Sequence, residues 1–144
     1  ALKITWAAPV NHPQLLEAIA AQLEPYREDI PLDRELQAAL REACQASGVP
    51  MSLALGLIEV ESSFQTDAVS SKNAYGLCQL NPKYFPEDLT PSENIAAGVG
   101  YLGELMGRYE TVESALTAYN AGSDTEDRAY ADAVLAAAEK WRKP

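Results

Sequence analysis

One apolar stretch, from Met51 to Ser62, constrains the fold of this chain more than any other feature. Its apolar residues fall on most sides of a helix, and a helix of that kind is normally buried inside a domain. Val49-Pro50 precedes the stretch and fits a helix start. We therefore expect a central buried helix with the other elements packed around it.

Glu61 stands near the C-terminal end of this expected helix. An apolar environment disfavours the charged form of a carboxyl group, and so does the negative end of the helix dipole. Both effects raise the pKa of Glu61, so its side chain can hold a proton near neutral pH and give it to a leaving oxygen. Glu61 is therefore a candidate general acid.

The other helices are predicted from local start and stop signals. Asp33 as N-cap and Gly48 as C-cap bound one helix. Thr90-Pro91-Ser92-Glu93 has the pattern of a capping box and opens a helix that ends near Tyr109. The remaining predicted helices span residues 13–24, 112–120 and 126–141, the last after a second capping-box candidate at residues 123–126.

Two segments lack a helical pattern. Residues 1–10 alternate weakly and are interpreted as a strand or an extended arm. Residues 65–91 are rich in Ser, Asn, Gly, Pro and Lys, and we interpret them as an ordered loop region with one short element around residues 75–80. The sequence thus predicts a mainly α fold, and 144 residues favour a single domain.

Composition excludes several classes of protein. The formal net charge is −10, which argues against binding to the phosphates of nucleic acid. No apolar run reaches the length of about 18 residues that a membrane-spanning helix needs. The chain begins at Ala1 and shows no signal peptide, so we expect that an upstream signal or domain has been removed or left out.

The cysteines and the histidine predict no metal or cofactor site. Cys44 and Cys78 are too few and too far apart for a metal site, and we interpret them as small buried residues. A disulfide between them stays open and would fit an exported protein. The one histidine, His12, lies in Asn11-His12-Pro13, which fits a helix start better than a catalytic base.

Several motifs occur together in a fixed order and carry a resemblance. They are Glu61-Ser62-Ser63-Phe64, Ser70, Gly76-Leu77-Cys78-Gln79, Asn94-Ile95-Ala96-Ala97-Gly98 and Ala118-Tyr119-Asn120-Ala121-Gly122. In this order and spacing they resemble the soluble lytic transglycosylase domain, which has a lysozyme-like fold and is related to goose-type lysozyme. The resemblance runs from about residue 35 to residue 141. We expect a catalytic domain over residues 32–144 and an N-terminal extension without assigned role over residues 1–31.

The resemblance implies a reaction and its residues. Glu61 would be the single acid/base that cleaves the bond between N-acetylmuramic acid and N-acetylglucosamine, with formation of a 1,6-anhydro sugar and no second carboxylate. Ser70 and Gln79 would line the substrate groove. Tyr119 and Asn120 would face Glu61, with the Tyr119 hydroxyl orienting the carboxyl group. The implied partners are peptidoglycan glycan strands outside the cytoplasm, with membership of a larger chain or cell-envelope machine left open.

Three further residues near these motifs are secondary candidates. Ser62 is interpreted as a helix-end hydrogen bonder rather than a nucleophile. Asp67 is a turn residue or, alternatively, a second carboxylate at the cleft. Asn81 stands where the family often has an apolar residue or Thr, so sugar contacts differ there. After Gly122 the chain also reaches its last helix sooner than the family pattern does.

Two alternative functions remain open at this stage. The first is a hydrolase of the same fold, a goose-type muramidase, for which Asp67 would position a water. The second is a non-catalytic glycan-binding or structural module of a phage tail or secretion machine, which the acidic charge and the short segment after Gly122 favour.

Overall fold

The structure is a computed structural model that describes residues 13, 15, 16 and 25–142. By internal contacts the chain separates into Ala1–Ile30 and Pro31–Pro144, and the helices described below belong to the second unit. Of the helix predicted over residues 13–24, only residues 13, 15 and 16 are described, and all three are helical. The predictions for residues 1–10 and for His12 lie outside the described residues.

The first two helices of this unit confirm their predicted boundaries. Helix α2 spans Arg34–Ser47, and its N-cap Asp33 accepts a hydrogen bond from the Leu36 N–H at 2.8 Å. It ends at Gly48, whose φ of 75° lies in the left-handed region that glycine adopts without strain. Helix α3 follows over Met51–Ser62. Residues 53–58 of α3 are all buried, as expected for a helix that is apolar on most sides.

The next two helices also agree with their predicted ranges. Helix α4 spans Pro91–Arg108, and Thr90 and Glu93 exchange both hydrogen bonds of a capping box. Helix α5 spans Val112–Ala121 and ends at Gly122, which has a φ of 84°. Local capping chemistry therefore sets most of the helix ends from Asp33 to Gly122, including the start of α5, where the Thr111 Oγ1 accepts from the Ser114 N–H at 3.1 Å.

The predicted start of the last helix is wrong. Helix α6 spans Ala129–Trp141, so the residues of the supposed capping box at 123–126 precede it. The Arg128 side chain explains the difference, because it binds the Asp124 carboxylate at 2.7 Å and the Thr125 carbonyl oxygen at 2.9 Å. These bonds hold residues 123–126 in a loop. The predicted capping box would instead have started a helix at these residues.

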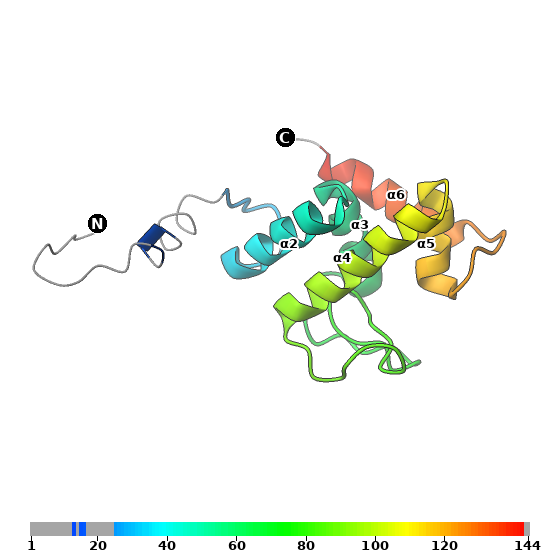
Figure 1. Cartoon of the computed structure of the whole chain (residues 1–144), viewed down its shortest axis with the longest axis horizontal. Helices are drawn as coiled ribbons and strands as arrows, with labels where there is room; N and C mark the ends of the chain where they lie inside the picture. Colours follow the sequence, from blue (N-terminus) through cyan, green and yellow to red (C-terminus); the bar gives the residue numbers. More distant parts are fainter. Residues whose placement is uncertain (1–12, 14, 17–24, 143–144) are drawn as a thin grey trace, which may run out of the picture. The chain divides into compact units, whose positions relative to one another are not determined.

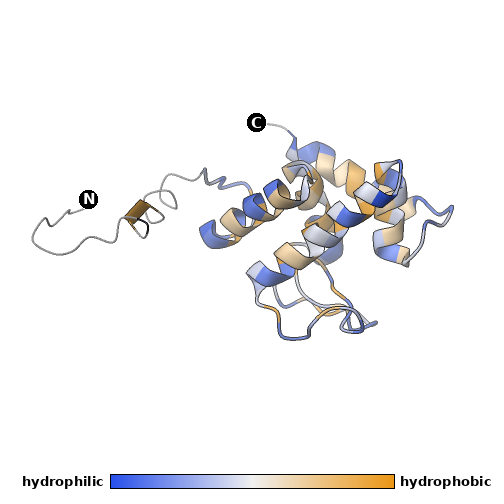
Figure 2. Cartoon of the chain, in the orientation of Figure 1, coloured by the Kyte–Doolittle hydropathy of each residue, from blue (hydrophilic) through white to orange (hydrophobic). Residues whose placement is uncertain are grey.

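The five helices from α2 to α6 pack in a closed order. Helix α2 contacts α3 and α4, α4 contacts α5, α5 contacts α6, and α6 packs extensively against α3. Figure 1 shows α2 and α4 side by side, with the loop between α3 and α4 on one side of them. Hydrophilic and hydrophobic residues alternate along α2 and α4 (Figure 2), as in helices with one face in the core. The mainly α fold is confirmed.

The contact between α3 and α6 is unusually close at Gly56. A Cβ atom at this position would lie 2.7 Å from both the Ala138 N and the Val134 O of α6. Only glycine therefore permits the two helix backbones to approach this closely. This approach brings the C-terminal half of α3, which carries Glu61, against α6.

The loop between α3 and α4 is ordered by its own backbone bonds. Tyr75 forms an antiparallel bridge with Val69 and another with Leu80, which confirms the short element expected near residues 75–80. The loop is held to α4 by the side-chain amide of Asn94, which is fully buried. Residues 63–90 thus form a fixed wall beside the end of α3.

Among the helices that the structure describes, none is by itself long and apolar enough to span a membrane. Helices α2 and α3 reach that length and composition only when taken together, and they meet at a bend of 120°.

Candidate functional site

Glu61 lies in the last turn of α3, and its Oε2 accepts a hydrogen bond of 3.0 Å from the hydroxyl of Tyr130. Burial raises the pKa of Glu61 from its ordinary value to about 7, while the bond from Tyr130 acts in the opposite direction. A carboxyl group with this pKa exists in both protonation states near neutral pH. It can therefore give a proton in one step and take one back in the next.

Tyr130, the hydrogen-bond donor to Glu61, is a site residue that the sequence did not reveal. The sequence pattern placed it among the residues that fill the last helix, and it stands 69 positions after Glu61. Burial and the neighbouring Glu61 raise the pKa of the Tyr130 hydroxyl far above its usual value, so it stays protonated and donates. The sequence offered only a general indication, namely that the hydroxyl of a buried tyrosine usually has a hydrogen-bond partner.

Tyr119 lies near Glu61, and the charge of Glu61 is one of the causes that raise the pKa of the Tyr119 hydroxyl. Its hydroxyl donates to the Cys78 carbonyl oxygen at 2.7 Å, whereas the hydroxyl that donates to Glu61 is that of Tyr130. Gly98 makes the contact possible, since a Cβ atom there would lie 2.3 Å from the Cys78 Cβ and 3.2 Å from the Tyr119 hydroxyl. Asn120, the next residue, is exposed at the end of α5.

The loop segment that carries Gln79 is held from α4 by Asn94. The Asn94 Oδ1 accepts from the Cys78 N–H at 2.8 Å, and its Nδ2 donates to the Tyr75 carbonyl at 3.1 Å. A side chain at Gly76 would collide with this amide, since its Cβ would lie 2.2 Å from the Asn94 Nδ2. The motifs at 76–79 and 94–98 therefore form one structural unit.

Gln79 itself is half-buried and has a positive φ of 51°. Its Nε2 donates to the carbonyl oxygens of Ala68 at 3.0 Å and Gly76 at 2.9 Å. Both amide hydrogens are used within the loop, which leaves the Oε1 as the atom able to accept a hydrogen bond from a ligand.

Ser70 and Asn81 both stabilise turns of the same loop. The Ser70 Oγ accepts from the backbone N–H groups of Lys72 and Ala74, at 3.2 and 3.1 Å. Asn81 is exposed, and its Oδ1 accepts from the Lys83 N–H at 2.9 Å. A shallow hollow of about 510 Å³ lies beside them, lined by Lys72, Asn73, Asn81, Pro82, Lys83 and Glu87.

The residues on either side of Glu61 have structural contacts. The Ser62 hydroxyl donates to the Ile58 carbonyl at 3.0 Å, which is the helix-end bond expected of it. Glu59 points toward α6, where its Oε2 pairs with the Lys140 Nζ at 2.9 Å. Asp67 is exposed in the turn after α3. The side chain that donates a hydrogen bond to Glu61 is the Tyr130 hydroxyl.

Cys44 and Cys78 are both buried free thiols in the structure, as the sequence interpretation favoured. Burial raises the pKa of Cys44 to about 11, and that of Cys78 rises further because burial and the nearby Glu61 act together. Across the described ranges, no three or more His, Cys, Asp or Glu side chains are grouped so that they could hold a metal ion.

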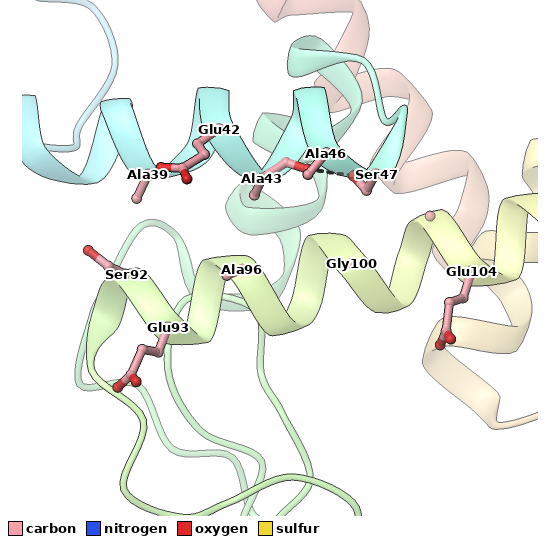
Figure 3. A pocket seen from close by; sticks show the side chains of 11 residues that line it. Ala39, Glu42, Ala43, Ala46, Ser47, Ser92, Glu93, Ala96, Gly100 and Glu104 are labelled. Atoms are coloured by element: carbon pink, nitrogen blue, oxygen red, sulfur yellow. Dashed lines mark hydrogen bonds between the residues drawn. The ribbon is translucent and has the colours of Figure 1, made fainter. Parts of the chain in front are cut away.

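A hollow of about 690 Å³ lies elsewhere, between α2 and α4. Small residues line it from both helices, and Ala39 and Ala43 stand opposite Ala96 and Gly100 (Figure 3). None of the candidate site residues borders it. Its position therefore sets it apart from the surroundings of Glu61.

The structure is thus a helical domain in which the half-buried carboxyl group of Glu61 has a raised pKa. Comparison with known families then identifies it: the model of the "Transglycosylase SLT domain" matches residues 38–141. The chain therefore belongs to this family.

Two curated relatives show the extent of the similarity. The membrane-bound lytic murein transglycosylase C of Glaesserella parasuis is 32% identical over 125 residues, which cover 70% of this chain and 34% of that protein. The protein of the same name from Haemophilus influenzae is 36% identical over 86 residues, or 49% of this chain and 24% of its own length. The chain thus spans about a third or less of the length of these relatives.

A solved structure confirms the fold. An inactive glutamate-to-glutamine mutant of the lytic transglycosylase Slt from Pseudomonas aeruginosa superposes with a TM-score of 0.63 and 24% sequence identity. The match covers 90% of this chain and 28% of that chain. The lysozyme-like fold expected from the sequence is therefore the fold of this chain.

Proposed function

We propose that residues 32–144 form the catalytic domain of a peptidoglycan lytic transglycosylase, with Glu61 as its single acid/base. The observation that carries the proposal is the raised pKa of Glu61, about 7, at the end of a buried helix beside a tyrosine hydroxyl. Family membership supports it, as do the names of the relatives. The Slt structure also supports it, since that inactive mutant replaces a glutamate by glutamine.

The reaction would proceed in two proton transfers. Protonated Glu61 gives its proton to the oxygen that links N-acetylmuramic acid to N-acetylglucosamine, and the bond breaks through an oxocarbenium-like state. The Glu61 carboxylate then takes the proton of the muramoyl 6-hydroxyl, whose oxygen attacks C1 of the same sugar. The products are a free N-acetylglucosamine end and a 1,6-anhydro-muramoyl end, and Glu61 returns to its protonated form.

Tyr130 has a defined part in this sequence. Its hydroxyl donates to the Glu61 Oε2, and a hydrogen bond to the ionised form stabilises the carboxylate that exists between the two transfers. Without this bond, burial would leave the carboxylate much less stable than the acid. The balance of the two effects places Glu61 near the pKa at which both transfers are efficient.

The groove beside Glu61 would hold the glycan strand through the loop of residues 63–90 and the end of α5. Ser70 can donate its hydroxyl proton, Gln79 can accept through Oε1, and the exposed Asn120 can contact the sugar or a water. Asn81 and the hollow beside it would extend the groove. The proposed location is outside the cytoplasm, where peptidoglycan lies.

The test is mass spectrometry of soluble products after incubation with purified peptidoglycan. We expect anhydro-muropeptides from the wild type and none from Glu61→Gln, which keeps the shape of the side chain but carries no acid. Glu59→Gln is the matched control, since Glu59 stands two residues earlier and pairs with Lys140. It should retain activity.

Each other outcome has a meaning. Products with an ordinary reducing end are heavier by one water and would show a hydrolase in place of the proposed reaction. Unchanged cleavage by Glu61→Gln would remove Glu61 from the mechanism. Binding of glycan strands by the folded wild type without any cleavage would show a glycan-binding module.

A further inference from the structure

The Arg128 side chain makes several hydrogen bonds close to the start of α6. It precedes α6 directly, and its Nη1 donates to the Thr117 Oγ1 at 2.8 Å, the Asp124 Oδ1 at 2.7 Å and the Thr125 carbonyl at 2.9 Å. Its Nη2 lies 3.4 Å from the Ser114 Oγ. Two of these partners belong to α5 and two to the loop between α5 and α6.

The contacts of Arg128 close the loop between α5 and α6. The side chain is only 37% exposed, and its hydrogen bond, with one from Ser114, lowers the pKa of Asp124 so that the carboxylate stays charged. The Arg128 carbonyl also accepts the first hydrogen bond of α6, from the Asp132 N–H at 2.8 Å. The same residue thus ties α6 to α5 through its side chain and starts α6 through its backbone.

Tyr130 lies two residues after Arg128, in the first turn of α6. Farther along, α6 is anchored to α3 by the close contact of Val134 and Ala138 with Gly56. The first turn lies before that contact; the Arg128 side chain does not cap it, and the Asp127 Oδ1 accepts from the Ala129 N–H at 3.0 Å. Because the ends of helices open more readily than their centres, the position of the Tyr130 hydroxyl depends on what holds this turn.

We propose that Arg128 is a positioning residue: by fastening the first turn of α6 to α5, it keeps the Tyr130 hydroxyl on the Glu61 carboxylate. Its importance for catalysis rests on the function proposed above, whereas the contact itself does not. The bond from the Ala129 N–H to Asp127 stays within the start of α6, whereas the bonds of Arg128 to Thr117 and Ser114 join this start to α5.

The surroundings of Glu61 allow the effect to be isolated. The titratable groups that face Glu61 are Tyr130 from α6, Tyr119 from α5 and Cys78 from the loop, and all three have a raised pKa. The hydrogen bonds of the Arg128 side chain go to α5 and to its own loop, and Arg128 is not among the causes of the pKa shift of Glu61. Any influence of Arg128 on the titration of Glu61 is therefore expected to pass through Tyr130.

The experiment is a pH titration of Glu61 by NMR, with the glutamate carboxyl carbons labelled, in four proteins: wild type, Arg128→Met, Tyr130→Phe and the double variant. Tyr130→Phe removes the stabilising bond and raises the pKa of Glu61. We expect Arg128→Met to raise it in the same direction, and the double variant to titrate like Tyr130→Phe alone. Additive shifts, or no shift in Arg128→Met, would overturn the proposal.

Two controls separate positioning from general effects. Arg142→Met removes an arginine that pairs with Glu139 at the other end of α6, and it should leave the Glu61 titration unchanged. Arg128→Lys keeps the charge but not the planar fork, so we expect a shift here too, and it replaces Arg128→Met if that variant does not fold. A wild-type titration in Arg128→Lys would show a charge effect and overturn positioning. The titration reads the contact without substrate, so an inactive wild type would refute only the proposed function.

Discussion

At the scale of single residues, two opposed effects act on Glu61. Burial favours the protonated form, and the hydrogen bond from Tyr130 favours the charged form. Burial is the larger effect, which is why the pKa rises to about 7. An acid/base that must both give and take a proton works best near this balance, because neither protonation state is then rare.

A pH profile tests this balance. The proposed reaction needs protonated Glu61 at its first step, so the wild-type rate should fall by about tenfold per pH unit well above pH 7, the pKa of Glu61. Tyr130→Phe should move this descending limb to higher pH, because loss of the bond favours the proton, and should lower the maximal rate. The measurement is the release of soluble muropeptides between pH 5 and pH 9. A limb that stays in place, or moves to lower pH, would contradict the assigned role of Tyr130.

The residues of the site differ in how far the sequence could reveal them. The raised pKa of Glu61 was predictable because its place near the end of an apolar helix is a local feature of the sequence. The partner of its carboxyl group was not, because Tyr130 is 69 positions away and reaches Glu61 only through the packing of α6 on α3. The same limit affected Tyr119: its neighbourhood was predicted, but the acceptor of its hydroxyl proton, the Cys78 carbonyl, depends on the turn of a distant loop.

At the scale of elements, glycine decides how closely α3 and α6 approach. Gly56→Ala would place a methyl group 2.7 Å from two backbone atoms of α6. The helices would have to separate, and we expect a loss of about 1–3 kcal/mol in the free energy of unfolding, with weaker cleavage as Tyr130 moves away. Urea unfolding and muropeptide release measure the two effects.

Gly100→Ala is the matched control in α4. A Cβ atom there would meet nothing within 4 Å, so the variant should gain about 0.5–1 kcal/mol from better helix propensity. Equal stability changes in the two variants would show that the spacing between α3 and α6 does not depend on Gly56.

The boundaries of the elements show what local sequence can and cannot predict. Asp33, Gly48, Thr90 with Glu93, and Gly122 act on the backbone within a few residues of themselves, so the ends that they define were predictable. The start of α6 was not, because residues 123–126 have a capping pattern but Arg128 binds them and α5 instead. A contact with α5 cannot be read from a pattern of four neighbouring residues.

At the scale of the whole molecule, its carboxyl groups respond to pH in two opposite ways. The pKa of Glu93 is lowered by its bond to the Thr90 backbone, and that of Asp124 by its bond to Arg128. Such groups contribute stability above their ordinary pKa, and this contribution is lost as pH falls through the lowered value. Glu61 behaves in the opposite way, because its pKa is raised from the ordinary value of 4.5 to about 7.

Stability against pH therefore provides a test of Glu61 that needs no substrate. Since the folded state binds the Glu61 proton more tightly than the unfolded state, the stabilisation is fully present below pH 4.5 and is lost as pH rises through about 7. Glu61→Gln cannot ionise and should not lose it. The variant should thus match the wild type at pH 4 and exceed it at pH 8.5 by up to about 3 kcal/mol in the free energy of unfolding.

Urea unfolding of both proteins at the two pH values measures this difference in the free energy of unfolding. Glu42→Gln, at an exposed position on α2, controls for the loss of one negative charge from a chain with a net charge of −10. A gap between Glu61→Gln and the wild type that is equal at both pH values would show that burial does not perturb Glu61. A gap that opens only at high pH would mean that the fold gives up stability at neutral pH to keep a proton where the proposed reaction needs it. The packing of α3 against α6 then sets both the burial of Glu61 and its hydrogen bond from Tyr130. Any change that loosens this packing should therefore weaken the burial and the hydrogen bond together.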